Sequence, residues 1–273
     1  MTDLWWRAHH PEPLSLRAKS NVAAALTERN LDFELDYIPP TGDCQRTTIV
    51  HNDTRVVLGI LSDDEQVRNP VNTFDYISTF VASARWNIDQ AWTNYGGRVV
   101  KIAVVDSSQH GAFICTARYD DAPDTIKYLP IVWYGGRPVA MSAGLSYPDP
   151  APATSRELAD TANRLRNETK SFIAGLRMTK KSSTELEKLL RRALLNENGN
   201  ASARHSDYEA VAHGDVRLQS CWHLLVALTT HYDRAPYPTP TAREHAVTQG
   251  RPARVIKEVI RELLGSVGHA AHN

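Results

Sequence analysis

The chain has 273 residues and a mass of 30.5 kDa, with 31 Lys+Arg against 31 Asp+Glu. Its 42% hydrophobic and 23% charged residues are ordinary for a globular protein and exclude a coiled-coil rod or wholesale disorder. No apolar run approaches the ~18 residues of a membrane span, the first residues carry no basic signal region, and the three cysteines lie far apart. We therefore expect a soluble cytoplasmic protein without a disulfide framework and without membrane contact.

The zero net charge hides an asymmetry between the two halves of the chain. Residues 1–150 hold 13 basic and 18 acidic residues, a net charge of −5, whereas residues 151–273 hold 18 and 13, a net charge of +5. A basic segment of this kind can bind a polyanion locally, although a charged helix face is also often merely solvated.

Residues 1–30 read as an N-terminal arm with a short helical stretch at 20–29. Trp5 and Trp6 are adjacent and close to the terminus, so a surface must cover them. That surface belongs either to the body of this chain or to a neighbouring subunit, which makes both residues candidate oligomer contacts.

Residues 31–195 are expected to form an α+β core. Apolar and β-branched runs predict strands at 31–38, 47–51, 55–61, 88–95, 98–105, 112–119, 125–134 and up to 146, with one helix at 72–86. Short glycine or polar turns join consecutive strands, which favours an antiparallel β-meander over alternating βαβ units. A proline-rich linker at 147–153 follows.

The rest of the chain is predicted to be helical. Capping boxes at Thr154–Glu157 and Ser182–Glu185 each open a helix, and an apolar stripe from Leu158 to Leu176 should pack on the sheet. We expect a flexible linker at 196–206 and a C-terminal helical region at 207–273. Within that region a helix at 216–233 precedes a last helix between Pro252 and Gly265.

Catalytic motifs are sparse. The sequence has no GxGxxG, GxxxxGK[ST], HExxH or GxSxG motif. Asp63-Asp64-Glu65 could bind Mg²⁺ but is better read as a solvated loop, and His223 and His231 lie ~12 Å apart on one helix, too far to share a metal. We expect no catalytic residue, no metal and no cofactor; a metal-dependent nuclease is the enzyme class left open.

A basic row on the helix after Thr154 is the most coherent signal for function. Its members fall within about 60° of one another on a helical wheel and are Arg166, Lys170, Arg177 and Lys181. Residues near the double-glycine turns could extend the row, namely Arg98, Lys101 and Arg137. Such a groove would follow a phosphate backbone, and neighbouring aromatic residues could stack on bases. These are Trp92, Tyr95, Trp133 and Tyr134, for each of which core packing is the alternative.

Two short motifs resemble a known family. Val57-Leu-Gly-Ile-Leu-Ser62 with Tyr95-Gly-Gly-Arg98, and the later Trp222…Thr-His-Tyr232-Asp233, are similar to a phage- and plasmid-borne family of uncharacterised proteins, the "LGT" family. The order of helix, β-meander and long basic helix also resembles the core of single-strand annealing proteins of the RecT, Redβ and Rad-fifty-two groups. That resemblance implies a β-β-β-α unit that assembles into rings or filaments and holds single-stranded DNA between sheet and helix.

The resulting expectation is a phage- or plasmid-type protein of a bacterial host cell that binds single-stranded DNA and promotes strand annealing in DNA recombination as a homo-oligomer. The alternative, favoured by the neutral pI and the acidic first half, is a phage-encoded protein-binding factor that targets a host defence or replication protein.

Overall fold

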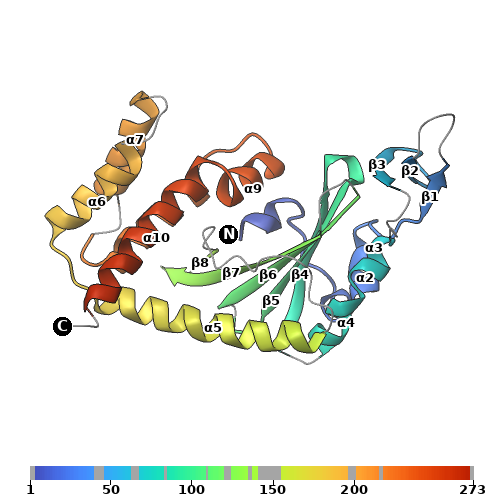
Figure 1. Ribbon diagram of the computed structural model, residues 1–273, viewed down its shortest axis with the longest axis horizontal. Helices are drawn as coiled ribbons and strands as arrows, with labels where there is room; N and C mark the ends of the chain where they lie inside the picture. Colours follow the sequence, from blue (N-terminus) through green and yellow to red (C-terminus); the bar gives the residue numbers. More distant parts are fainter. Residues whose placement is uncertain are drawn as a thin grey trace. The chain divides into compact units, whose positions relative to one another are not determined.

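The computed structural model describes residues 4–39, 46–62, 68–82, 85–108, 110–119, 124–134, 137–140, 155–195, 201–214 and 218–270. Side chains are not described at 62, 132, 134, 137, 139, 155, 195, 201–204 and 264–270. The fold is α+β, with antiparallel sheets followed by C-terminal helices (Figure 1), which confirms the predicted fold class.

The chain forms two compact units. The first, which we call the sheet unit, consists of residues 6–129 and 145–163; the second, the helical unit, consists of residues 1–5, 130–144 and 164–273. This division differs from the boundaries expected at 30, 195 and 206, because one strand and one long helix each continue from one unit into the other.

The sheet unit contains a three-stranded antiparallel sheet with the order β1-β2-β3. Its strands are Leu35–Ile38, Arg46–His51 and Val57–Ser62. The predicted hairpin joins β2 and β3 through a turn that ends at Arg55, whose φ of 57° is the left-handed conformation. A bulge between Ile49 and Val50 shifts the register, which pairs Ile49 with Gly59 but Val50 with Val57.

Short helices accompany this sheet. They are η1 (Trp5–Ala8), α1 (Leu16–Lys19), α2 (Val22–Glu28), α3 (Pro70–Thr73) and α4 (Asp75–Ala82). Side chains of Ser15, Asn21 and Asn69 cap α1, α2 and α3 by accepting backbone amide hydrogen bonds. The apolar stripe predicted for one helix at 72–86 is buried at Phe74, Ile77 and Val81, but the structure divides that helix into α3 and α4 and places Trp86 on a strand.

The second sheet has the strand order β4-β5-β6-β7-β8 and is the predicted meander (Figure 1). Its strands are Trp86–Asn94, Val99–Asp106, Gly111–Arg118, Thr125–Tyr134 and Arg137–Ala140. The turn from β4 to β5 carries three consecutive positive φ angles, at Tyr95, Gly96 and Gly97. Gly97 is also close-packed, because an added Cβ would lie 3.2 Å from Cδ2 of Leu58.

The N-terminal tryptophans are buried within this chain, so the prediction that they contact another subunit is corrected. Trp5 is 2% exposed and Trp6 is fully buried. In the sheet unit, Nε1 of Trp6 donates to Asp89 on β4 at 2.7 Å, and the guanidinium of Arg7 donates to both carboxylate oxygens of Asp89 at 2.7 and 2.8 Å. This bidentate pair anchors the arm.

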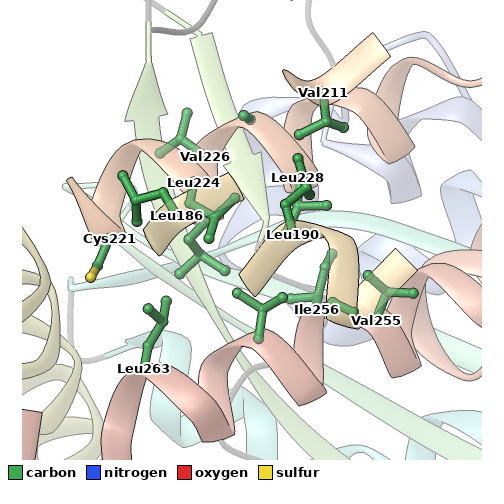
Figure 2. Packing of buried hydrophobic residues seen from close by; sticks show 14 of the residues in the cluster. Leu186, Leu190, Val211, Cys221, Leu224, Val226, Leu228, Val255, Ile256 and Leu263 are labelled. Carbon is green, nitrogen blue, oxygen red and sulfur yellow. The ribbon is translucent and has the colours of Figure 1, made fainter. Parts of the chain in front are cut away.

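The helical unit packs its helices around one apolar cluster (Figure 2). The helices are α5 (Ser155–Met178), α6 (Ser183–Leu195), α7 (Ala201–Ala212), α8 (Cys221–Arg234), α9 (Pro240–Thr248) and α10 (Arg251–Ala270), and the unit includes α5 from residue 164 onward. Fully buried residues of the cluster include Leu190 on α6, Leu224 on α8 and Leu263 on α10.

Two predictions about these helices are wrong. Residues 201–206 of the expected flexible linker are helical, because buried Tyr208 and Val211 fix α7 against the cluster; residues 196–200 lie outside the described part of the chain. Helix α10 also does not end at Gly265 but continues to Ala270. In the described residues, none of the helices is both long enough and apolar enough to cross a membrane.

Candidate nucleic-acid interface and a polar pocket

The basic row predicted from the sequence lies on one flank of α5. The apolar stripe of this helix is buried at Leu165, Thr169 and Leu176. Arg166, Lys170 and Arg177 follow about 100° around the helix from that stripe. Lys170 and Arg177 are exposed, whereas Arg166 is half-buried. The helix therefore keeps a row of positive charge at its solvent border.

Lys181 does not continue the row by helical spacing. Helix α5 ends at Met178, where Thr179 closes the last turn by donating its amide and its hydroxyl to the carbonyl of Gly175. Lys181 lies in the connection before Ser182, and that serine begins α6 through the predicted capping box. Burial raises the pKa of the Cys221 thiol, and the charge of the nearby Lys181 ammonium opposes this only in part.

The stripe of α5 was expected to pack on the sheet along its length, and for its C-terminal part this is corrected. Leu176 belongs to the apolar cluster of the helical unit, and Phe172 and Ile173 pack against that cluster. The partners of this half of α5 are therefore the helices whose residues form that cluster.

Two members of the row have notable surroundings. The guanidinium carbon of Arg177 lies 4.9 Å from the centre of the Trp222 ring, a cation–π contact that holds the arginine at the surface of α8. Nε of Arg166 is shielded from water and has no hydrogen-bond acceptor among the residues that the structure describes. This atom is therefore an unsatisfied donor within the protein, and a ligand could contact Arg166 only through the exposed part of its side chain.

The residues predicted to extend the row lie in both units. Arg98 is exposed and donates through Nε to the carbonyl of Val57 at 3.4 Å, and Lys101 is half-buried on β5, opposite Trp92 and Thr116. Both belong to the sheet unit, whereas α5 from residue 164 belongs to the helical unit. The side chain of Arg137 on β8 lies outside the described part. A continuous groove through all seven residues stays a prediction.

The candidates for base stacking differ in how exposed their side chains are. Trp92 is 1% exposed and stacks on His9 with ring centres 5.3 Å apart, so it is a core residue and the prediction is corrected for it. Tyr95, at the β4–β5 turn, and Trp133, on β7, are exposed. The side chain of the fourth candidate, Tyr134, is not described.

The acidic run Asp63–Glu65, considered above as a possible Mg²⁺ site, lies outside the described residues.

A polar pocket that the sequence did not reveal lies in the helical unit. It has a volume of about 590 Å³ and is lined by α7, α8, the segment after α8 and the first residues of α10. At its centre, Oδ1 of Asp207 is 3.0 Å from Nε2 of His231, and Oδ2 of Asp207 accepts a hydrogen bond from Nη1 of Arg251. Three helices thus contribute one charged or titratable group each.

The carboxylate of Asp207 is stabilised in its charged form. Burial opposes ionisation and acts to raise its pKa, but the hydrogen bonds and charges of His231 and Arg251 outweigh burial, and the pKa of Asp207 is lowered. Nearby, Tyr237 donates its hydroxyl to the carbonyl of Tyr232 at 2.9 Å, and burial raises the Tyr237 pKa. Arg243 pairs with Asp233 at 2.7 Å and ties α9 to α8.

Neither His223 nor His231 belongs to a metal centre among the described residues. Among the described residues, no group of three or more His, Cys, Asp or Glu is placed to hold a metal ion. His223 contacts the hydroxyl of Ser220 through Nδ1 at 2.9 Å, while His231 contacts Asp207, so the two histidines have separate partners.

Comparisons with known proteins return nothing for this chain: no protein-family model, no curated protein and no solved structure matches it. The resemblance to the phage and plasmid family and to annealing proteins therefore stays an expectation from short motifs. The class that the structure defines is an α+β protein with a basic helical flank and a polar pocket.

Proposed function

We propose that this protein binds single-stranded DNA through the basic flank of α5 and promotes strand annealing as a homo-oligomer. The observation that supports the proposal best is the arrangement of α5 itself: its apolar stripe is buried while Lys170 and Arg177 are exposed on one flank, with Arg166 half-buried beside them. Residues 164–273 hold 17 basic and 11 acidic residues, so this flank belongs to a unit of net charge +6.

Phosphate neutralisation would supply most of the affinity. Each contacted phosphate of a single strand releases condensed counterions, which lowers the logarithm of affinity by about 0.7 for each tenfold rise in salt. Tyr95 and Trp133 are the exposed aromatic residues that could add base stacking, worth about 1–3 kcal/mol for each base. Annealing needs no cofactor, because it requires only extended strands with accessible base edges.

The test measures anisotropy of a fluorescent oligonucleotide across a salt series. We expect Arg166→Gln with Lys170→Gln to weaken binding at low salt and to reduce the salt slope by about 1.4, from two lost phosphate contacts. Arg164→Gln is the matched control, since Arg164 lies on the opposite flank of α5 and pairs with Glu168 at 3.1 Å. An equal salt slope in the wild type, the Arg166→Gln/Lys170→Gln double variant and Arg164→Gln would refute the proposal.

Mass photometry on the same samples tests assembly and annealing separately from binding. Rings or filaments on DNA and faster pairing of two complementary labelled strands support the annealing role. A protein that binds DNA with the expected slope but stays a monomer and pairs no strands would retain the binding function only.

The second candidate, a protein-binding factor, is favoured by a different surface. On the three-stranded sheet, Ile38 on β1, Thr48 on β2 and Ile60 on β3 lie in one cross-strand row, and both isoleucines are exposed. Tyr37 and Val57 on the same strands are exposed as well, but strand alternation places Tyr37 on the opposite face and Val57 lies beyond the bulge, so the candidate surface consists of the two isoleucines. Apolar side chains gathered on an open sheet are typical of a protein contact. If the chain ignores DNA even at low salt, Ile38→Ser with Ile60→Ser should abolish association with its partner.

A further inference from the structure

We propose that the pocket of the helical unit binds a small organic oxyanion, a phosphate or carboxylate group carried on an apolar body of about the size of one ring. This inference goes beyond the proposed binding of DNA and rests on other residues. It starts from the charges that line the pocket. The described residues that line it include two arginines, Arg234 and Arg251, together with His231 and one carboxylate, that of Asp207.

The carboxylate does not make the pocket negative. Both oxygens of Asp207 are engaged, Oδ1 by His231 and Oδ2 by Arg251, with the hydroxyl of Tyr232 3.5 Å from Oδ2. Its charge is therefore compensated inside this cluster. Among the described residues that line the pocket, Arg234, exposed at the end of α8, therefore gives an excess of one positive charge. An anion is the charge-complementary ligand.

The cluster is also rigid, as an oxyanion site requires. Asp207 is held by two helices besides its own, and the side chains of Asp207, His231 and Arg251 are 20%, 25% and 27% exposed. They are accessible from the pocket but are not free surface groups. Nε2 of His231 faces Asp207, so the other ring nitrogen, Nδ1, can donate to an oxyanion only when the imidazole is protonated. A positioned carboxylate behind a histidine or arginine is the usual way to fix such a donor.

The N-terminus of α10 adds a favourable dipole. This helix runs from Arg251 to Ala270, and its first residues line the pocket. The first-turn amides of a long helix carry a partial positive charge that stabilises an anion. Thr230, 9% exposed and also lining the pocket, has a buried hydroxyl without a hydrogen-bond partner among the described residues. A polar group of this kind is an available donor for a bound oxygen.

The remaining walls are apolar and define the body of the ligand. Rings and small side chains also line the pocket, among them Tyr232, Tyr237, Pro236, Pro252 and Val211. A volume of about 590 Å³ lies in the range of small-molecule sites. The chemistry that fits this arrangement is one oxyanion at the Arg–His end and one apolar ring between the tyrosines and prolines.

The experiment is calorimetric titration of the full chain at pH 7 and low ionic strength with four probes of similar shape. Phenyl phosphate and benzoate carry the two oxyanions, benzyl alcohol is neutral and benzylamine is cationic. We expect phenyl phosphate or benzoate to bind at least tenfold more tightly than benzyl alcohol, and the difference between the two anions assigns the group. Tighter binding of benzylamine, or equal binding of all four, would overturn the inference.

Variants locate the site. Arg234→Gln should weaken binding of the better anion about tenfold, as loss of one charge-assisted contact of about 1.4 kcal/mol implies. Arg251→Lys keeps a positive charge beside Asp207. It should nevertheless weaken binding of the anion, because the planar guanidinium with its two parallel donors is lost. Arg254→Gln, an exposed site on the same helix, is the matched control and should leave binding unchanged. Equal affinity in Arg234→Gln and Arg254→Gln would place the ligand elsewhere.

Lys170→Gln separates this inference from the proposed DNA binding. That variant should bind the anionic probe like the wild type while losing affinity for the oligonucleotide. Should Lys170→Gln lose both, the probe would be reporting the basic flank of α5, and the pocket would carry no site of its own.

Discussion

Asp207 joins three helices through hydrogen bonds from side chains of α8 and α10. Asp207→Asn removes the charge that balances Arg251 and His231, and we expect a loss of about 2 kcal/mol in unfolding free energy at pH 7. The lowered pKa of Asp207 gives the sign of the pH dependence. This stabilisation is complete above the ordinary pKa of 3.8 and disappears as the pH falls through the lower pKa of the folded state.

Urea unfolding at pH 7, 5 and 3 measures this difference. The gap between wild type and Asp207→Asn should be smaller at pH 3 than at pH 7 and 5, because the unfolded carboxylate and then the folded one are protonated as the pH falls. Glu209→Gln, an exposed change on the same helix, serves as the control and should change stability little at any pH. An undiminished gap at pH 3 would show that the charge of Asp207 is not what stabilises the unit.

The residues of the pocket could not have been found from local sequence pattern. Asp207 lies 24 residues before His231 and 44 before Arg251, and no motif has such spacing. The sequence pattern links His231 with His223, because both lie on one helix. Its actual partner, Asp207, lies on another helix, α7. The basic row on α5 is the opposite case: helical periodicity alone determines which of its residues share a flank.

At the scale of elements, local hydrogen bonding decides where helices begin. Ser220 begins α8, and its hydroxyl accepts the amide hydrogen of His223 at 3.3 Å. Ser220→Ala should lower the unfolding free energy by about 1 kcal/mol, because a buried amide loses its acceptor. Ser171→Ala, an exposed position within α5, should change it by less than about 0.5 kcal/mol. Denaturant unfolding of the two variants checks this, and equal effects would contradict a capping role.

The sequence predicts most elements correctly where the signal is local. The Ser182–Glu185 capping box forms as expected, with the amide of Ser182 donating to Glu185 at 2.8 Å. The β2–β3 hairpin and the strands of the meander also follow from alternation and turn residues. Helix α7 does not, because its polar sequence is held helical by the burial of Tyr208 and Val211, and such tertiary packing has no local signature.

At the scale of the whole molecule, the two compact units imply separate responses to a core mutation. Leu190 is fully buried in the apolar cluster, and Leu190→Ala should cost about 3 kcal/mol from lost burial and the cavity left behind. Hydrogen exchange should then accelerate in α8 and α10 of the helical unit, while amides of β5 in the sheet unit keep their protection. Uniform acceleration in both units would mean that the chain unfolds as one cooperative body.

In the described part of the chain, each unit contains one buried cysteine. Cys115 is on β6, where burial, partly offset by a hydrogen bond with Tyr76, raises its pKa to about 12; Cys221 is on α8, where burial raises the pKa of the thiol as well. A thiol that is both covered and protonated does not react with an alkylating reagent until its surroundings open. The alkylation rates of Cys115 and Cys221 therefore report how often each unit opens. Mass spectrometry of the labelled peptides measures the two rates separately, without an added probe.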